Sequence, residues 1–508
     1  MRTPKAGVTP VLSVRGVSKR FGAVQALADV TLDFHAGEIH AVLGENGAGK
    51  STLMNILGGL YRSDAGTIVF DGRPLSLRSP RAARAAGIGM VHQHFTLIDT
   101  LTVAENVALS LPRSSRWRFD AAADGRATQA LARQLGLSIG APQLRVAELP
   151  VGARQRLEIL KAWARAGRLL ILDEPTAILT PQETQQLFAM LRALRAQGQL
   201  VIFITHKLRE VSEVADRVTI MRRGQVVGTY DAADITASDM AERMVGEVVP
   251  AAPAERRALD GAVALRVVGV SVRHAQRMSG LDDVSFAVRQ GEIFGIAGVD
   301  GNGQRELFEV LVGLALPVSG SLTVGDVPIT VFTPSAALAA GIGHIPPDRR
   351  REGLVLAMSL LDNFLLNRTV LNRFSRHGLL RRAAARHFVM ELAHRYAIRL
   401  PDLQLPMRVL SGGNQQRVIV ARELAEHPAV LVAVNPTRGL DISATTLVAG
   451  ALREAARRGC AVVLISTDLD EVLDLSDRVG VLSRGRLSGP LSPPIDLGRL
   501  GLLMAGAA

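Results

Sequence analysis

The feature that most constrains this chain is an internal repeat. Residues 44–49 (GENGAG) recur as residues 298–303 (GVDGNG), at an offset of 298 − 44 = 254. Further along, residues 216–218 (DRV) recur as residues 477–479, at an offset of 477 − 216 = 261. Separated matches that share two offsets are not chance similarity. The chain therefore holds one folding unit twice, and the second copy has gained a net 261 − 254 = 7 residues.

The two copies are joined by a segment without an apolar period. Residues 246–262 (GEVVPAAPAERRALDGA) carry prolines, alanines and charges, which is typical of a linker. This pattern predicts two domains, residues 1–245 and 263–508. Length alone, at roughly 150 residues per domain, would suggest about three domains.

Within each copy, short apolar runs alternate with longer helical stretches. In the first copy the runs 38–43, 169–172 and 200–204 are typical of buried strands, and residues 52–60 and 184–194 are typical of helices. This alternation favours a largely parallel sheet in an α/β fold.

The composition limits the kinds of partner and compartment. The chain has 59 Lys+Arg against 47 Asp+Glu, a formal net charge of +12, which favours nucleic acid, nucleotide phosphates or an acidic membrane face as partner. The single cysteine excludes an intramolecular disulfide framework and a Cys-rich zinc site. No uninterrupted apolar run reaches the length of about 20 residues that a membrane span needs, and residues 1–10 lack the apolar core of a signal peptide. We therefore expect a cytoplasmic location.

Residues 44–51 (GENGAGKS) match the phosphate-binding pattern G-x-x-x-x-G-K-[ST] in full. An apolar run precedes them and a helical stretch follows, so the glycines can turn backbone N–H groups onto phosphate oxygens at a helix N-terminus. Lys50 is suited to the β- and γ-phosphates and the Ser51 hydroxyl to Mg²⁺. The motif predicts a nucleoside triphosphate site.

The apolar run 169–172 ends in two carboxylates, Asp173 and Glu174. In a parallel α/β sheet, the carboxyl ends of the strands face the ligand crevice. Beside an intact phosphate loop, we expect Asp173 to hold Mg²⁺ and Glu174 to orient or deprotonate the attacking water. Gln93 and His206 follow two other apolar runs and indicate nothing by themselves.

Residues 410–416 (LSGGNQQ) resemble the signature sequence of the nucleotide-binding subunits of ATP-binding cassette (ABC) transporters. With the motifs above, the resemblance covers nearly the whole chain, twice over. It implies two tandem P-loop nucleotide-binding domains, each a mainly parallel sheet core with antiparallel β and helical subdomains. It also implies that Phe21 stacks on adenine, that Gln93 senses Mg²⁺ and couples to a permease, and that His206 contacts the γ-phosphate.

The resemblance assigns the expected site residues and the cofactors ATP and Mg²⁺. The ATP-binding set is Phe21, Gly44, Glu45, Asn46, Gly47, Ala48, Gly49, Lys50, Ser51, Thr52, Gln93, Ser411, Gly412, Gly413 and Asn414. The metal-binding set is Ser51, Gln93 and Asp173, and the catalytic set is Lys50, Glu174 and His206.

Each copy departs from this pattern in a different motif. The second copy replaces Lys50, Ser51, Gln93, Asp173, Glu174 and His206 by Gln304, Arg305, Pro347, Val434, Asn435 and Thr467. The first copy has residues 149–153 (LPVGA) where a signature is expected. Cassettes of this family close head-to-tail, each ATP lying between one phosphate loop and the other cassette's signature. The resemblance therefore implies one complete composite ATPase site and one degenerate site in which nucleotide binding stays open.

Two cassettes in one chain without membrane spans resemble the ATPases of bacterial importers for simple sugars and nucleosides. Residues 87–107 are most similar to the nucleoside branch. This implies integral-membrane permease subunits as partners and, through them, a periplasmic or lipid-anchored solute-binding protein, with the chain peripheral on the cytoplasmic face of the inner membrane and no nucleic acid bound.

Two alternatives stand beside the importer. A soluble tandem-cassette ATPase acting on the ribosome or on DNA would suit the positive charge, but such proteins usually keep both ATP sites and a long charged linker. A scaffold that does not hydrolyse ATP conflicts with the complete set of Lys50, Ser51, Asp173 and Glu174.

Overall fold

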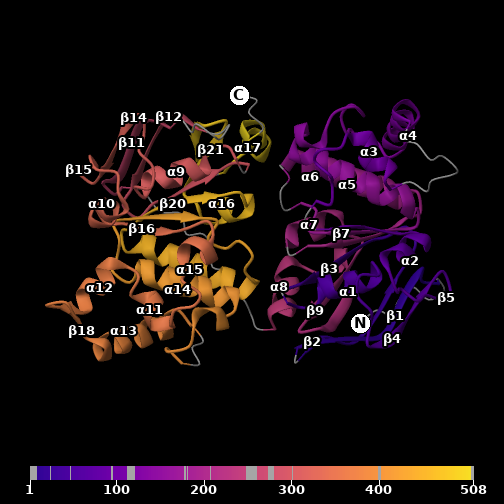
Figure 1. The fold of residues 1–508 in the computed structure, drawn as a ribbon, viewed down its shortest axis with the longest axis horizontal. Helices are drawn as coiled ribbons and strands as arrows, with labels where there is room; N and C mark the ends of the chain where they lie inside the picture. The colour runs from indigo at the N-terminus through magenta and orange to yellow at the C-terminus, as the bar shows by residue number, and fades with distance from the viewer. Residues whose placement is uncertain are drawn as a thin grey trace. The chain divides into compact units, whose positions relative to one another are not determined.

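A computed structural model of the chain divides into two compact units, Met1–Ala251 and Ala252–Ala508 (Figure 1). It describes residues 9–504 apart from 23, 46, 93–94, 111–119, 177–178, 180, 206, 247–259, 273–279, 300, 399–401 and 493. Most of the predicted linker 246–262 therefore lies outside the described residues.

The first unit contains two sheets. An antiparallel sheet has the strand order β2 (Val24–Phe34), β1 (Leu12–Phe21), β4 (Ala65–Phe70) and β5 (Arg73–Pro74). A mainly parallel sheet has the order β10 (Gln225–Asp231), β9 (Arg217–Arg222), β3 (Ile39–Gly44), β8 (Leu200–Ile204), β7 (Leu169–Asp173) and β6 (Ile88–Val91), in which only the β9–β10 pair is antiparallel. Its helices are α1 (Lys50–Leu57), α2 (Pro80–Ala85), α3 (Val103–Ala108), α4 (Ala121–Gln134), α5 (Val151–Ala166), α6 (Pro181–Ala196), α7 (Leu208–Val214) and α8 (Ala237–Val245).

The second unit repeats both sheets. The antiparallel order is β12 (Leu281–Arg289), β11 (Val263–Val272), β14 (Ser319–Val324) and β15 (Val327–Pro328). The mainly parallel order is β16 (Ile342–Ile345), β19 (Val430–Val434), β20 (Ala461–Ser466), β13 (Ile293–Ala297), β21 (Arg478–Ser483) and β22 (Arg486–Leu491), and a small hairpin pairs β17 (Ser375–Arg376) with β18 (Leu379–Leu380). Its helices are α9 (Gln304–Leu311), α10 (Pro334–Ala339), α11 (Leu360–Phe364), α12 (Arg368–Phe374), α13 (Arg382–Arg395), α14 (Gly412–Leu424), α15 (Ile442–Arg457), α16 (Leu469–Leu475) and α17 (Leu497–Met504).

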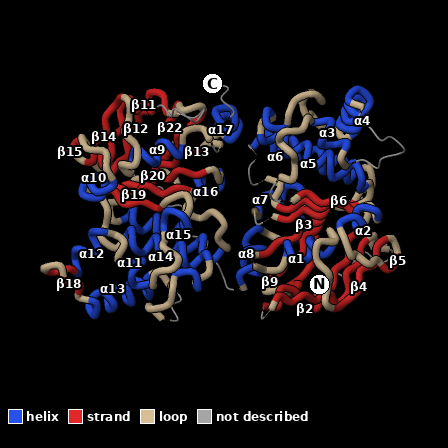
Figure 2. The backbone as a smooth tube through the Cα atoms, in the orientation of Figure 1, coloured by secondary structure: helices blue, strands red, loops and turns tan. Residues whose placement is uncertain are grey.

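In each unit the parallel sheet separates two layers, as Figure 2 shows. One face of the first unit's sheet packs with the antiparallel sheet, α1 and α2, and the other face packs under the helical layer that contains α3, α5 and α6. The strands β3, β7 and β8 are buried at every residue because helices or a second sheet cover both faces. The predicted α/β class with a parallel core, antiparallel β and helical parts is confirmed.

The predicted helix boundaries needed correction. The helix expected at 52–60 spans Lys50–Leu57, because Gly49 caps its start at a φ of 99° and Gly58 caps its end. The helix expected at 184–194 is longer at both ends, Pro181–Ala196. The strand expected at 200–204 is confirmed. No helix in the described part of the chain is long and apolar enough to cross a membrane.

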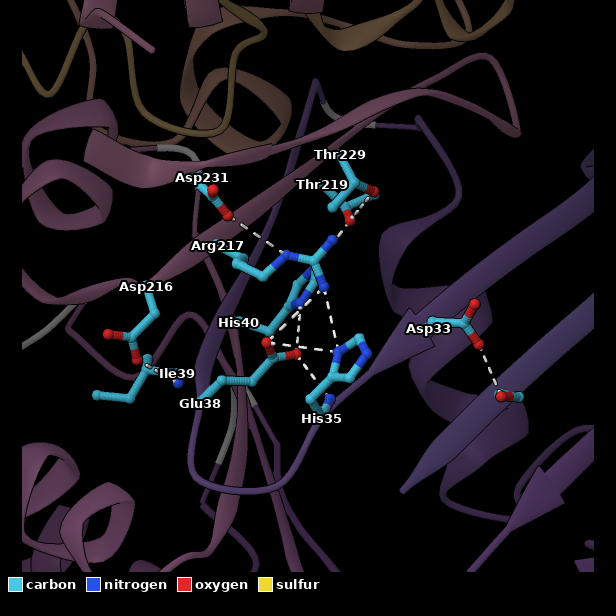
Figure 3. A network of polar contacts seen from close by, with 11 residues as sticks. Asp33, His35, Glu38, Ile39, His40, Asp216, Arg217, Thr219, Thr229 and Asp231 are labelled. Atoms are coloured by element: carbon cyan, nitrogen blue, oxygen red, sulfur yellow. Dashed lines mark hydrogen bonds and ion pairs between the residues drawn. The ribbon is translucent and has the colours of Figure 1, made fainter. Parts of the chain in front are cut away.

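A buried polar network lies at the amino end of strand β3 (Figure 3). The His40 ring is 3.0 Å from the Glu38 carboxylate through Nδ1 and 2.7 Å from the Thr219 hydroxyl through Nε2. Arg217 lies 3.8 Å from the same carboxylate. Burial lowers the pKa of His40, although Glu38 opposes that shift. Burial by itself would raise the pKa of Glu38, but its hydrogen bonds and the charges nearby hold it below the usual value.

Candidate functional site

Three glycines shape the loop between β3 and α1. A Cβ added at Gly44 would lie 2.5 Å from the Met221 carbonyl oxygen, and one added at Gly49 would lie 2.6 Å from the Ala26 carbonyl oxygen. Around Gly47, whose φ is 85°, no described atom beyond its chain neighbours comes within 4 Å of an added Cβ. The loop is tightly packed at both ends and faces open space between them, which suits a loop that closes around a phosphate.

Lys50 opens helix α1 at the end of this loop. Its side chain is only 5% exposed, and its ammonium donates hydrogen bonds to the Gly44 carbonyl at 2.6 Å and the Glu45 carbonyl at 3.0 Å. Burial lowers the pKa of Lys50, whereas the charges of Glu174 and Asp173 raise it. The structure thus brings the predicted lysine within electrostatic reach of both predicted carboxylates.

Asp173 ends strand β7 and is 8% exposed. Burial raises its pKa and the charge of Glu174 raises it further, while Lys50 and a hydrogen bond from the Ser51 hydroxyl lower it. Oxygen ligands of this kind suit Mg²⁺, which typically takes one or two carboxylates and keeps several waters. Ser51 and Asp173 therefore fit the metal-binding role predicted for them.

Glu174 follows β7 in a left-handed conformation, with a φ of 48°. Its backbone N–H donates to the Ile204 carbonyl at 3.0 Å, which ties the turn to the neighbouring strand β8. A non-glycine residue in this region stores on the order of 1–2 kcal/mol of strain, and such strain concentrates at functional sites. The turn fixes the Glu174 carboxylate beside Asp173 at the carboxyl edge of the sheet.

Phe21 ends strand β1 with an accessible ring. The side chain is 44% exposed, the Tyr61 ring meets it edge-on at 5.3 Å, and the Lys19 ammonium lies 5.4 Å from the ring centroid. An exposed, supported aromatic face can stack on a planar ring.

The other predicted residues of the first unit fall into two groups. Ala48 is buried and donates its N–H to the Glu45 carbonyl at 3.0 Å, and Thr52 is half-buried on α1. Asn46, Gln93 and His206 lie outside the described residues, so their roles stay predictions.

The second unit keeps the loop but uses its side chains differently. Gln304 is 6% exposed, donates from Nε2 to the Val299 carbonyl at 2.9 Å and accepts from the Asn302 N–H at 3.0 Å. Arg305 is held by two carboxylates, Glu309 at 2.6 Å and Glu352 at 2.7 Å. A cavity of about 610 Å³ adjoins them, lined among others by Arg349, Arg438, Asn435 and Thr467. The residues equivalent to Lys50, Ser51 and Glu174 therefore lie around one space in this unit too. The carboxylate pair is absent there, because Val434 and Asn435 stand in its place.

The predicted signature residues begin helix α14. Ser411 is the N-cap, and its hydroxyl accepts from the Asn414 N–H at 3.4 Å and from the Asn414 side chain at 3.2 Å. Gly412 and Gly413 form the first turn and are partly exposed. The Arg349 guanidinium lies beside this helix start, 2.8 Å from where a Cβ added at Gly412 would be. The backbone N–H groups of a helix start favour an anion.

Sequence comparisons decide the family. The ABC transporter model matches residues 27–177 and 281–438, one match in each unit. The chain belongs to the ABC transporter family. The predicted resemblance is confirmed, and with it an ATP-binding ATPase with two cassettes.

Full-length relatives of this ABC protein carry import names. The guanosine import ATP-binding protein NupO of Bacillus subtilis is 42% identical over 98% of both chains. The nucleoside import ATP-binding protein NupA of Lactococcus lactis is 39% identical over 98% of both chains. A ribose import ATP-binding protein, RbsA 2 of Streptomyces avermitilis, is 40% identical over 96% of this chain and 95% of its own.

A solved structure extends the likeness to another member of the fold. The archaeal ribosome recycling factor aABCE1, in complex with the stalk protein aP1, superposes with a TM-score of 0.64 over 97% of this chain and 92% of its own. Its identity is 17%, so this likeness shows the fold alone. The sequence relatives favour an import ATPase over the alternative that acts on the ribosome.

The start of α5 in the first cassette shows a feature that the motif search missed. Pro150 is its N-cap and makes no side-chain capping bond, where the second cassette has Ser411. In addition, the Glu183 carboxylate lies against Gly152, so close that an added Cβ would overlap it. Glu183 stands at the register of Ala444 (444 − 183 = 261), and this substitution could have been found from the repeat offset. The first cassette thus places the Glu183 carboxylate against this glycine, where the second cassette has the Ala444 methyl group against Gly413.

Proposed function

We propose that this chain is the ATP-hydrolysing subunit of an importer for nucleosides or simple sugars, with nucleosides the first choice. The import names of the full-length relatives support this class, and two of those named above are nucleoside-type importers. The observation that carries the enzymatic part is the cluster of Lys50, Ser51, Asp173 and Glu174 at the carboxyl edge of the first cassette's sheet.

Hydrolysis in this proposal is positional and electrostatic. The loop N–H groups and Lys50 bind the β- and γ-phosphates and stabilise the charge that develops on the transferring phosphoryl group. Glu174 orients the attacking water and accepts its proton, and Phe21 stacks on the adenine. Ser51 and Asp173 would hold Mg²⁺, which supplies charge neutralisation to the phosphates when bound.

One hydrolytic site per chain follows from the distribution of these groups. The complete site would pair the first cassette's loop with Ser411–Gly413 of the second. The other site would pair a loop that holds Gln304 and Arg305 with a helix start covered by Glu183. The internal hydrogen bonds of Gln304 and the ion pairs of Arg305 support a site without hydrolysis.

The remaining assignments follow from the import class. The partners would be integral-membrane permease subunits and, through them, a solute-binding protein. Gln93 would couple the nucleotide site to the permease, and the chain would be peripheral on the cytoplasmic face of the membrane.

Glu174→Gln tests this proposal in the assembled importer. In proteoliposomes with the permease subunits and the solute-binding protein, wild-type turnover of ATP should rise with a nucleoside and not with a pentose. Glu174→Gln should lower turnover by about 10²–10⁴-fold while ATP still binds, because it removes the proton acceptor and leaves the loop intact.

The matched control is Asn435→Gln, which changes the same turn in the second cassette. It should leave turnover within about twofold of wild type. An Asn435→Gln loss as large as that of Glu174→Gln would overturn the single hydrolytic site. Stimulation by a pentose alone would move the cargo to simple sugars.

A further inference from the structure

The second cassette contains a cavity far in the sequence from its nucleotide loop. It has a volume of about 520 Å³ and lies among α13, α14, α15 and the starts of β19 and β20. Figure 1 shows these three helices together on one side of the second unit's parallel sheet, away from α9. Small-molecule pockets typically hold about 300–1,000 Å³, so this space is large enough for a ligand of two or three rings.

Three side chains that line the cavity are smaller than their equivalents in the first copy. At the offset of 261, Leu424, Ala451 and Ala455 stand at the registers of Trp163, Met190 and Leu194. In the first unit those three larger side chains are buried, with exposures of 8%, 5% and 1%. Two lining residues are larger in the second copy, Tyr396 at the register of Leu135 and His427 at that of Ala166, and the hollow remains beside them.

The walls of the cavity are apolar and partly buried. Val420 and Leu424 of α14 face Val448, Ala451 and Ala455 of α15 across it. The chain's single cysteine, Cys460, is buried at its base, and burial raises the pKa of this thiol to about 12, so the thiol is neutral and adds to the apolar surface. A ligand would therefore bury an uncharged body here.

The rim of the cavity is basic. Arg395, Arg417 and Arg458 line it against a single acid, Glu454. The Glu454 carboxylate already accepts bonds from Arg457 at 3.0 Å and Arg458 at 2.9 Å.

Two of these arginines are specific to the second copy. The registers of Arg395, Arg417 and Arg458 hold Gln134, Arg156 and Gln197 in the first copy. The second copy thus places two further guanidinium groups at the edge of the space, while Glu454 replaces Ala193 and Ala429 replaces Arg168 there.

We propose that this cavity is a binding site for a small amphipathic anion, an aromatic or short-chain body that carries one carboxylate, sulfonate or phosphate group. The apolar body of the ligand fills the space beside Leu424, Ala451 and Ala455, where the first copy has the larger Trp163, Met190 and Leu194. The anionic group lies at the rim among Arg395, Arg417 and Arg458. The site does not depend on the proposed cargo or on the nucleotide site.

The experiment uses two probes that differ by one charge. 8-Anilino-1-naphthalenesulfonate is such an anion, and N-phenyl-1-naphthylamine is the same body without the sulfonate. Fluorescence titrations of the full-length protein should show one saturable site with higher affinity for the sulfonate.

Arg458→Gln installs the first copy's residue. It should lower the affinity for the sulfonate probe by about threefold and leave the affinity for the neutral probe unchanged, because a partly exposed charge pair contributes modestly. Arg457→Gln is the matched control, since Arg457 does not line the cavity, and should have no effect.

Filling the cavity tests its location. The double variant Ala451→Met and Ala455→Leu installs the first copy's side chains. It should lower the affinity for both probes by at least about tenfold. Ala383→Met adds the same side chain at an exposed position of α13 and should change neither affinity. If the double variant does not fold, Leu424→Trp is the second filling variant and should have the same effect.

Thermal unfolding gives a second readout. Filling a real hollow should leave the melting temperature unchanged or higher, whereas adding methylenes to a packed core would lower it. Unchanged probe affinities in a folded filling variant would overturn the proposal, as would equal affinity of wild type for the two probes.

Discussion

The two cassettes have nearly the same backbone at the end of the strand that carries the catalytic carboxylate in one of them. Glu174 and Asn435 both adopt left-handed conformations, with φ values of 48° and 45°. Both donate their N–H groups to the neighbouring strand, to Ile204 at 3.0 Å and Ile465 at 2.8 Å. Asparagine adopts this conformation more readily than glutamate. The fold therefore supplies the turn in both cassettes, and the first cassette accepts strain to place a carboxylate there.

The phosphate loops also share their shape and differ in their side-chain chemistry. Lys50 donates to two loop carbonyls, and Gln304 makes one such bond and accepts a second from a backbone N–H. Both side chains are almost fully buried. The second loop has therefore lost the positive charge but not its internal hydrogen bonds, which is the pattern of a loop kept for its shape.

Exchanging these two residues should give the largest effect. Lys50→Gln removes the charge that faces the phosphates and should lower ATP turnover by at least about 10²-fold. Gln304→Lys should leave turnover unchanged, because Val434 and Asn435 still supply no metal ligand or base. Steady-state turnover and nucleotide binding, measured on both variants, check the pair. A doubling of turnover by Gln304→Lys would mean that the second cassette's loop is catalytically competent.

Local patterns predicted much of this arrangement. The repeat offset gave the equivalence of Lys50 with Gln304, and the strand ends placed Asp173 and Glu174 at the sheet edge. Patterns did not predict the contact of Glu183 with Gly152, because it depends on how α6 packs against α5. Nor did they predict that His40 would bond to Thr219, since those residues are 179 apart in sequence and meet only because β9 pairs with β3. The cavity beside α15 was also missed, because packing volume is a property of several elements at once.

A second comparison concerns two equivalent positions, Lys161 on α5 and Arg422 on α14. Arg422 is buried, pairs with Glu423 at 2.8 Å and donates to the carbonyls of Gly353 and Asn363 at 3.0 and 3.2 Å. Its first-unit equivalent, Lys161 (422 − 161 = 261), donates to the Thr96 carbonyl at 2.8 Å in an exposed position.

Arg422→Ala should lower the free energy of unfolding of the second unit by about 3–5 kcal/mol, because it leaves the buried Glu423 charge without its partner. Lys161→Ala should cost under about 1 kcal/mol. Urea unfolding can separate the units, since both tryptophans, Trp117 and Trp163, are in the first unit. Circular dichroism should show a transition shifted by Arg422→Ala, and tryptophan fluorescence should not. Equal costs for the two variants would show that burial does not decide between them.

The smallest predicted effect on stability concerns the strand that precedes each phosphate loop. His40 of β3 is replaced in β13 by Phe294, which stacks on Phe286 at 5.3 Å under the Arg478 guanidinium. There Arg478 pairs directly with Glu292 at 2.7 Å, whereas in the first cassette the equivalent Glu38 bonds to His40. The second cassette thus shows that a phenylalanine fits this strand without the histidine.

His40→Phe should therefore remove a pH dependence and cost little at pH 8. Burial lowers the pKa of His40 below its ordinary value of about 6.5. As the pH falls through about 6.5, the unfolded chain binds more protons at this ring than the folded chain does, so the free energy of unfolding decreases. Above that range both states are neutral and the effect vanishes.

Between pH 7.5 and 5.5, the free energy of unfolding of the wild type should fall by about 1 kcal/mol more than that of His40→Phe, measured by urea unfolding with tryptophan fluorescence. His387→Phe, at an exposed position of the second unit, should keep the wild-type slope when unfolding of that unit is followed by circular dichroism. A His40→Phe slope equal to that of wild type would assign the pH dependence to other groups and remove His40 from the difference between the cassettes.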